Sequence, residues 1–240
     1  MDTPLPDRPP ETSEAISATD PFRPSEYTGL LMHALRLRAD GYGRDAGLDM
    51  GIGSGVLLAT LGMIGVRSLY GVDVDPDAVR ATEHLLAELG MLERAHLFCG
   101  SLWEPLGDMR FDIVTANLPH FAATEPSDPH HSPFWSMGGA DGRMLLDPFL
   151  AGLRAHLRDT GVALITHNVF VGMARTEAIL HANGLAARPV LSTTSILHPV
   201  KSALLAPGVR ASHEGSAIRR LGPYEFVDLQ ILEIRPMGAA

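Results

Sequence analysis

The residues DMGIGSG, Asp49 to Gly55, constrain the fold of this chain more than any other feature. An apolar stretch ends in an acid, the glycines Gly51, Gly53 and Gly55 follow, and the apolar run VLLATLGMIG comes directly after them. This order is typical of a buried strand, a tight turn and a helix. Glycine tolerates positive φ and lets backbone N–H groups approach a ligand, because it has no Cβ. The segment therefore predicts a ligand-binding turn in an α/β protein.

The spacing within this turn separates two classes of cofactor. In a dinucleotide-binding turn, a third small residue falls three positions after Gly53, where it lets the helix pack closely on the sheet. Here that position is Val56. Asp49 would also bring negative charge towards a pyrophosphate, whereas S-adenosylmethionine carries an ammonium and a sulfonium group and no phosphate. We therefore expect S-adenosylmethionine as the cofactor, with Asp49, Gly51, Gly53 and Gly55 in its site.

Length and composition predict one α/β domain. A chain of 240 residues with 45% hydrophobic residues can bury a substantial core, and we assign residues 22–240 to a single domain. Residues 1–21 are rich in proline and acid, which predicts a disordered tail and no signal peptide. The longest apolar run, near residues 56–66, is too short to span a bilayer.

Charge and cysteine content limit the partners and the cellular compartment that we expect. Cys99 is the only cysteine, so the chain has no internal disulfide, and we expect a soluble, cytoplasmic protein. The formal net charge is −9, and Arg219-Arg220 is the only basic cluster. Binding to a nucleic-acid backbone requires many cations, so we expect no nucleic-acid partner and no membrane partner. The oligomeric state is left open.

Helical and strand patterns alternate along the chain. Apolar runs predict strands near residues 48–50, 68–74, 95–99, 112–116, 162–166 and 187–192. Helical spacing predicts helices from a Ser25 N-cap through Leu37, from Gly55, and over residues 77–89, 143–157 and 173–182. This alternation predicts a doubly wound, mainly parallel sheet covered on both faces. The stretch 226–234 follows no helical pattern, so we expect it to be an antiparallel seventh strand at the edge of the sheet.

Polar residues follow the predicted strands at the edge where open α/β sheets bind ligands. Asp73 ends the second strand, where a carboxylate can accept hydrogen bonds from both ribose hydroxyls. Asp75-Pro76 has the pattern of a helix cap and first turn. Ser101 and the Leu102 amide follow the third strand and are candidates to contact the adenine ring, although Ser101 also fits a plain turn.

The residues NLPH, Asn117 to His120, end the fourth strand and predict a site for a methyl acceptor. An amide nitrogen is a poor nucleophile, so its N–H groups must be bound by acceptors that orient its lone pair. The Asn117 side-chain oxygen and the Leu118 backbone carbonyl can do this, Pro119 stiffens the corner, and the His120 ring can stack on a planar acceptor. His120 also fits an ordinary surface turn. If the acceptor is a hydroxyl or a protonated amine, His120 or His167 is a candidate general base.

With these motifs in place, residues 22–192 resemble class I S-adenosylmethionine-dependent methyltransferases of the HemK/PrmC group. The resemblance rests on RPSEYTGLL from Arg23, on DMGIGSG, on GVDVDPDAV, on the NLPH corner, and on the segment from Gly138 to Thr166. Members of the group methylate the side-chain nitrogen of glutamine in translation release factors. The resemblance implies a Rossmann-like methyltransferase fold. It also implies that Thr28, Asp49, Gly51, Asp73, Ser101, Leu102 and Asn117 line the cofactor and that residues 117–120 hold the acceptor.

The chain departs from the group at the acceptor end. The group usually has Asn-Pro-Pro-Tyr where this chain has Asn-Leu-Pro-His, and aspartate where this chain has Ser101. The segment from Pro119 to Gly142, with Phe121, Phe134 and Trp135, and the irregular stretch 192–224 are long enough to enclose a small molecule. These departures slightly favour N-methylation of an amine or amide metabolite over that of a protein glutamine.

Three further hypotheses remain. The protein could methylate an oxygen, carry out intramolecular lyase or cyclase chemistry on S-adenosylmethionine, or be a non-catalytic regulatory module that binds the cofactor. A metal site at His130-His131 with Asp128 is disfavoured, because adjacent histidines point apart and no third ligand has suitable spacing. We expect no metal.

Overall fold

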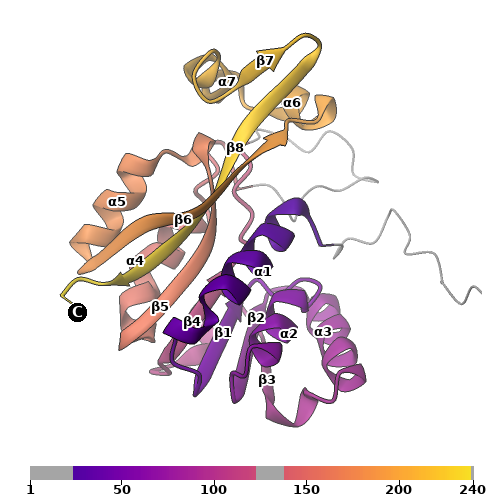
Figure 1. The fold of residues 1–240 in the computed structure, drawn as a ribbon, viewed down its shortest axis with the longest axis vertical. Coiled ribbons are helices and arrows are strands. Elements are labelled where there is room, and N and C mark those ends of the chain that lie inside the picture. Colours follow the sequence, from indigo (N-terminus) through magenta and orange to yellow (C-terminus); the bar gives the residue numbers. More distant parts are fainter. Residues whose placement is uncertain (1–23, 123–137, 239–240) are drawn as a thin grey trace, which may run out of the picture.

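The computed structural model describes residues 24–122 and 138–238, and its centre is one mixed β-sheet (Figure 1). The strand order is β3-β2-β1-β4-β5-β8-β6, with β7 paired to β8. The strands are β1 (Ala46–Met50), β2 (Ser68–Asp73), β3 (Ala95–Cys99), β4 (Phe111–Ala116), β5 (Leu157–Asn168), β6 (Leu185–Ile196), β7 (Arg219–Leu221) and β8 (Tyr224–Pro236). The pairs from β3 through β5 are parallel, whereas β8 is antiparallel to both β5 and β6. The expected α/β fold with a mainly parallel sheet and an antiparallel last strand is confirmed.

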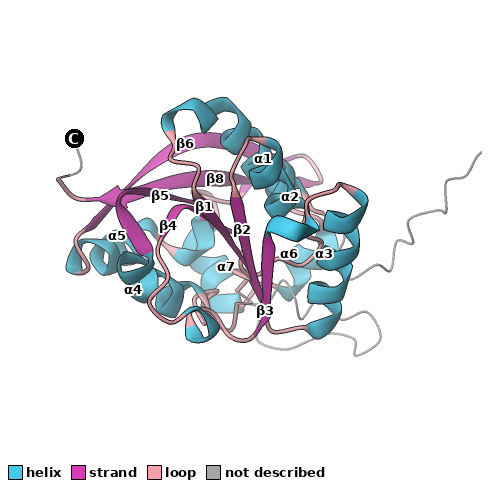
Figure 2. Ribbon diagram, turned by 90° about the horizontal axis from the view of Figure 1, so that it is seen from below, coloured by secondary structure: helices cyan, strands magenta, loops and turns pink. Residues whose placement is uncertain are grey.

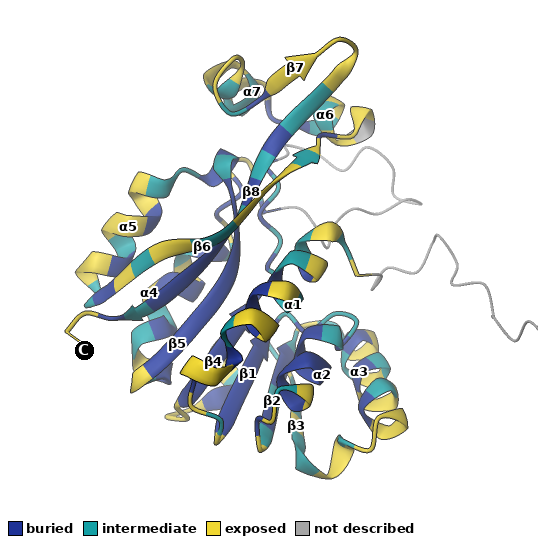
Figure 3. Ribbon diagram, viewed as in Figure 1, coloured by how far each residue is buried: buried dark blue, intermediate teal, exposed yellow. Residues whose placement is uncertain are grey.

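Helices cover both faces of the sheet, as Figure 2 shows from below. The helices are α1 (Glu26–Arg38), α2 (Val56–Met63), α3 (Pro76–Glu88), α4 (Leu146–His156), α5 (Met173–Ala182), α6 (Pro199–Leu204) and α7 (Pro207–His213). Side chains of α1, α2 and α3 form one buried cluster with one face of the sheet, and α4 and α5 form another with the opposite face. The strands between them are therefore mostly buried (Figure 3).

Local signals in the sequence set the helix starts. The Ser25 side chain accepts from the Thr28 amide and the Thr28 hydroxyl accepts from the Ser25 amide, which forms a capping box on α1. Asp75 caps α3 by accepting from the Asp77 amide at 2.8 Å, with Pro76 in the first turn. Both caps agree with the sequence-based expectation. Helix α4 begins at Leu146, three residues after the predicted Arg143.

Two expectations about the last third of the chain are wrong. Strand β8 is not at the edge of the sheet, because it lies between β5 and β6 and pairs with both. The stretch 192–224 is not irregular: β6 continues to Ile196, and α6, α7 and the short β7 follow it. These elements lie together at one end of the β6–β8 ribbon (Figure 1), over a small apolar cluster of their own. Their short helices carry no long periodic pattern, which is why the sequence did not reveal them.

The buried Glu233 carboxylate joins β8 to the first helix and to β6. It accepts from Arg38 at 2.8 Å, Tyr42 at 2.9 Å and Arg188 at 2.7 Å, and it also contacts Arg235. Burial alone would raise the pKa of Glu233, but these donors outweigh it and lower the pKa to about 2. Glu233 is therefore a carboxylate across the physiological pH range.

No helix in the described part of the chain has the length and apolar character needed to cross a membrane.

Candidate active site

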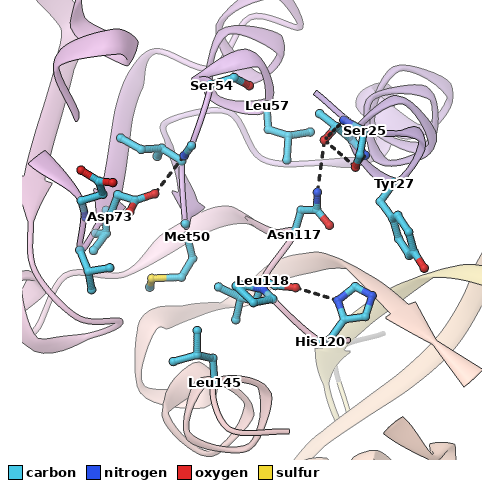
Figure 4. Close-up of a pocket in the computed structure, with 18 of the residues that line it drawn as sticks. Ser25, Tyr27, Met50, Ser54, Leu57, Asp73, Asn117, Leu118, His120 and Leu145 are labelled. Atoms are coloured by element: carbon cyan, nitrogen blue, oxygen red, sulfur yellow. Dashed lines mark hydrogen bonds between the residues drawn. The ribbon is translucent and has the colours of Figure 1, made fainter. Parts of the chain in front are cut away.

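A cavity of about 590 Å³ opens at the carboxyl ends of β1, β2 and β4, within the size range of about 300–1,000 Å³ that is usual for small-molecule sites. Figure 4 shows Asp73 at one end of it and Tyr27 and His120 at the other. Ten of the residues predicted for the site line it: Thr28, Gly51, Gly53, Asp73, Ser101, Leu102, Asn117, Leu118, Pro119 and His120. Asp49 and Gly55 do not.

The glycine turn after β1 has the predicted left-handed geometry, but its glycines serve different purposes. Gly51, Gly53 and Gly55 have φ values of +73°, +47° and +74°. A Cβ on Gly53 would meet nothing within 4 Å, so this residue leaves open space at the cavity. A Cβ on Gly55 would lie 2.8 Å from the Thr82 hydroxyl oxygen of α3. Gly55 therefore allows two helices to pack, and its expected place in the cofactor site is corrected.

Asp73 is held in place by backbone amides at the end of β2. One carboxylate oxygen accepts from the Gly53 amide and the other from the Asp75 amide, both at 3.0 Å. A carboxylate has about four acceptor positions, so Asp73 can still accept from two more donors inside the cavity. Binding of the ribose hydroxyls stays the prediction for these free positions, and the bond to Gly53 joins the carboxylate to the glycine turn.

Asp49 is fully buried beneath the turn, because successive side chains of β1 point to opposite faces and Met50 occupies the cavity side. The Thr115 hydroxyl donates to one Asp49 oxygen at 2.7 Å, and the other oxygen has no hydrogen-bond partner in the described structure. Burial, helped by the nearby charge of Asp73, raises the pKa of Asp49 to about 8 against the hydrogen bond from Thr115. Asp49 therefore does not reach the cavity.

The turn after β3 is anchored by Trp103, which sequence analysis did not single out. Its indole N–H donates to the Phe149 carbonyl at 3.1 Å, and its ring stacks on His156 with centroids 4.5 Å apart. Leu102 has a φ of +46°, which is the only left-handed conformation outside glycine in the described residues. Strain of this kind is found where a site fixes the backbone. Ser101 and Leu102 are thus presented to the cavity by a rigid turn.

Two threonines orient the Asn117 side chain. The Asn117 amide nitrogen donates to the Thr28 hydroxyl at 3.2 Å, and its oxygen accepts from the Thr166 hydroxyl at 2.9 Å. The two bonds hold the amide plane of Asn117 at both ends. The oxygen has a second lone pair, so one acceptor position remains for a ligand. Thr28, which was expected in the cofactor site, lines the cavity and also accepts a hydrogen bond from Asn117.

His120 closes the corner by bonding back to Leu118. Its Nδ1 lies 2.7 Å from the Leu118 carbonyl oxygen, and a carbonyl can only accept, so Nδ1 carries the proton and Nε2 is an acceptor. Burial lowers the pKa of His120 to about 4, and the charge of Lys201 adds to this, so the ring is neutral near pH 7. The Leu118 carbonyl also keeps one free acceptor position. The Tyr27 ring meets the His120 ring edge to face, with centroids 5.2 Å apart.

The glycine-rich turn before α4 supports this corner from behind. Gly142 has a φ of +74°, and a Cβ there would lie 2.5 Å from the His120 carbonyl oxygen. His167, the other candidate base, does not line the cavity. Its Nε2 lies 3.0 Å from the Thr176 hydroxyl, which also accepts from Arg143, and burial lowers its pKa to about 3. Its role is structural in this geometry.

Several residues of the acceptor half were not found from the sequence. Among them are Tyr27, Met144, Asn168 and Lys201. They come from α1, from the turn before α4, from β5 and from α6, so only the folded chain brings them together. Phe121 lines the cavity as expected, whereas Phe134, Trp135 and the histidine pair His130-His131 lie outside the described residues. In residues 24–122 and 138–238, no three histidine, cysteine or acidic side chains are placed to hold a metal ion.

The fold is that of the Rossmann-like methyltransferases. One solved structure with this fold is the T. thermophilus 16S rRNA N2 G1207 methyltransferase in complex with AdoMet and guanosine. It matches with a TM-score of 0.54 and 19% identity, over 90% of this chain and 44% of that chain. The family model for ribosomal protein L11 methyltransferase (PrmA) matches residues 32–120.

Two of the curated relatives are named as glutamine methyltransferases. The chain is 35% identical over 140 residues to the release factor glutamine methyltransferase of Geobacter sulfurreducens, covering 55% of this chain and 47% of that protein. It is 34% identical over 125 residues to the ribosomal protein uL3 glutamine methyltransferase of Bordetella pertussis, covering 49% and 42%. The chain thus spans about half the length of these relatives. The predicted resemblance to the HemK/PrmC glutamine methyltransferases is confirmed.

Proposed function

We propose that this protein is an S-adenosylmethionine-dependent methyltransferase that modifies the side-chain nitrogen of a glutamine in a protein substrate. The observation that carries the proposal is the pair of free acceptor positions at the NLPH corner. Asn117 Oδ1 and the Leu118 carbonyl oxygen each have one hydrogen bond from the protein and one position left. A primary amide has two N–H groups, so the corner offers one acceptor for each.

The opposite half of the cavity fits the nucleoside part of the cofactor. Asp73 keeps two acceptor positions for ribose hydroxyls, Gly53 leaves space free of side chains, and the Ser101–Leu102 turn borders the same space. S-adenosylmethionine would supply an electrophilic methyl group on its sulfonium. Phosphate-bearing cofactors fit less well, because the acids that line the cavity, Asp73 and Asp75, both stand at this end.

The main effect of the NLPH corner is to position the acceptor nitrogen. The lone pair of an amide nitrogen is delocalised, so binding both N–H groups orients the nitrogen towards the methyl group. Holding two reactants in this way can supply roughly 7–11 kcal/mol of the barrier. Thr28 and Thr166 hold Asn117, and His120 holds the Leu118 carbonyl, so the acceptors are in place before a substrate binds.

Glutamine is a better candidate than the alternatives that the sequence left open. Both curated relatives above are named for glutamine methylation, and the comparisons give no support to the small-metabolite acceptor that we slightly favoured. A hydroxyl acceptor would have to lose its proton to a base during attack. His120 is the candidate for this task, and its lowered pKa of about 4 makes it a weak one near neutral pH.

Variants at the two ends of the cavity test the proposal. Asp73→Ala should weaken S-adenosylmethionine binding in titration calorimetry, because the ribose hydroxyls lose their acceptor. Asn117→Ala should lower turnover by about 10²-fold, since the acceptor nitrogen is no longer oriented. Mass spectrometry of glutamine-bearing release factors and ribosomal proteins incubated with the enzyme should show the mass of one methyl group added at a glutamine. Unchanged cofactor affinity in Asp73→Ala, or methylation that never falls on nitrogen, would contradict the proposal.

A further inference from the structure

The chain contains a single lysine, Lys201, and it lines the cavity. The chain has 19 lysine and arginine residues, and all of them except Lys201 are arginines. Lys201 lies on α6, at its exposed face, and reaches the mouth of the cavity. Lysine and arginine are not interchangeable: an ammonium is a compact charge on a flexible stem, whereas a guanidinium is a rigid planar fork. The one lysine thus borders the space that a ligand would occupy.

Lys201 belongs to the acceptor half of the cavity. The Ala206 amide, just after α6, donates to the Ala122 carbonyl at 3.0 Å, and Ala122 is two residues beyond His120. Lys201 and His120 both line the cavity, and the charge of Lys201 adds to the lowering of the His120 pKa. Asp73, by contrast, is on β2, which is separated from β4 by β1. The cavity therefore has its acids at the cofactor end and a cation at the acceptor end.

The ammonium of Lys201 has no anionic partner among the described residues. The acid on the strand beside α6, Glu225, is fully engaged. It accepts from Arg210 at 2.6 Å, from Arg220 at 2.8 Å and from the Ser202 hydroxyl. These bonds lower the pKa of Glu225 to about 2, first through Ser202, and they tie α6 and α7 to β8. Lys201, one residue before Ser202, therefore lines the cavity without an ion pair to any of the described residues.

We propose that Lys201 binds the carboxylate of an acidic side chain that lies next to the methylated glutamine in the substrate. This inference rests on the proposed function and adds a substrate class to it: a glutamine in an acidic segment. A single flexible ammonium suits one carboxylate whose position is set by the amide at Asn117 and Leu118. A phosphate group would call for the paired or forked donors that arginine supplies, and no arginine lines the cavity.

The single lysine makes a direct binding test possible. An amine-acylating reagent modifies Lys201 and the N-terminal amine, and peptide mass spectrometry separates the two. We would measure the rate of acylation at Lys201 with S-adenosylhomocysteine bound, and then with either of two capped peptides. The peptides differ only in having glutamate or glutamine next to the target glutamine. The glutamate peptide should slow acylation several-fold more than its neutral counterpart.

Two results would overturn the proposal in this test. Equal protection by both peptides, or by neither, removes the carboxylate contact. Protection by S-adenosylhomocysteine alone, with no further effect of the peptides, would assign Lys201 to the methionine carboxylate of the cofactor. That outcome is also checked by calorimetry, in which Lys201→Gln should retain the wild-type affinity for S-adenosylhomocysteine.

Kinetics give an independent readout. Lys201→Gln should raise KM for the glutamate peptide by about tenfold or more, the loss expected for one charge-assisted hydrogen bond, with a much smaller change in kcat. Lys201→Arg should recover part of the affinity because it restores the charge. Arg36→Gln removes an exposed cation from the far end of α1 and serves as the matched control. It should leave the KM ratio of the two peptides as in the wild type.

The two proposals fail in different ways. If the glutamate peptide protects Lys201 but no peptide is methylated, the carboxylate contact stands and glutamine methylation fails. If both peptides are methylated with equal KM in the wild type and in Lys201→Gln, methylation stands and the role of Lys201 is wrong.

Discussion

Asp49 lies beneath the glycine turn, and its burial makes the stability of the fold depend on pH. Its carboxyl group is fully buried, has one oxygen without a partner and has a pKa raised to about 8. In the folded protein it is therefore mostly protonated at pH 7, whereas in the unfolded chain it ionises near pH 4. Between these values the folded state binds more protons than the unfolded state, so stability falls as the pH rises.

Asp49→Asn should remove this pH dependence. The variant has no proton to lose, so its free energy of unfolding, relative to that of the wild type, should rise steadily between about pH 4 and pH 8. Urea unfolding at several pH values measures the difference. Asp40→Asn, which alters an exposed carboxylate, is the control and should follow the wild type. A constant difference between Asp49→Asn and the wild type across this range would show that Asp49 is already ionised in the fold.

At the residue scale, the sequence predicted what local chemistry decides. Ser25 and Asp75 cap their helices as expected, because a cap depends on three or four neighbouring residues. Asp73 and Asn117 line the cavity because each follows a strand of the parallel sheet. Asp49 and Gly55 do not line the cavity, since strand alternation and contact with Thr82 decide their surroundings. The motif alone shows neither.

At the scale of elements, the acceptor corner depends on the turn that packs behind it. Gly142→Ala places a Cβ 2.5 Å from the His120 carbonyl oxygen at a φ of +74°, so the corner has to move. A displacement of about 1 Å can cost about 10²-fold in rate, and we expect a loss of this size in turnover with cofactor binding largely retained. Methyl transfer and calorimetry on the same preparation measure both.

Gly172→Ala is the matched control for this change. Gly172 has a φ of +73°, but a Cβ there would meet nothing within 4 Å. Both variants place an alanine at a positive φ, which costs about 1–3 kcal/mol of backbone strain, and only Gly142→Ala meets the corner. Similar turnover in the two variants would show that strain, and not displacement of His120, is responsible.

Elements with a strong period were predicted well, and those without one were missed. The parallel strands and helices α1, α3 and α5 lie within a few residues of the expected ranges. Helices α6 and α7 are 6 and 7 residues long, too short for a periodic signal, and they begin at Pro199 and Pro207. Since Lys201 lies on α6, its place in the acceptor half of the site could not be predicted from the sequence.

At the scale of the whole molecule, Glu233 links the first helix to the last strand. Glu233→Gln should destabilise the protein by about 3 kcal/mol. This is the low end for removing one partner of a buried ion pair, because the arginines around it can turn towards water. Urea unfolding near pH 7 measures the loss. Asp228→Asn, on the same strand but half-exposed in its pair with Arg219, is the control and should cost at most about 1 kcal/mol.

The contribution of Glu233 also has a defined pH window. Its pKa in the fold is about 2, below the value of an unfolded glutamate, so the stabilisation is present above about pH 4.5. It is lost as the pH falls towards 2. The difference between wild type and Glu233→Gln should therefore shrink in acid, and a difference that grows there would contradict the assignment.

The mainly parallel sheet and its antiparallel last strand were predicted, but the position of that strand between β5 and β6 was not. Alternating helices and strands specify a parallel sheet, but nothing in the apolar pattern of residues 226–234 distinguishes an edge strand from one inserted between two others. That choice is made by pairing on both sides, with β5 and with β6.

In the described sheet, β6 pairs only with β8, which is made after it. On the ribosome, the 12 residues of β6 therefore have no strand to pair with until residues 224–236 have emerged. This side of the sheet is completed only after β8 has been made. Until then the edge of β5 that β8 covers is open to pairing with a strand of another chain.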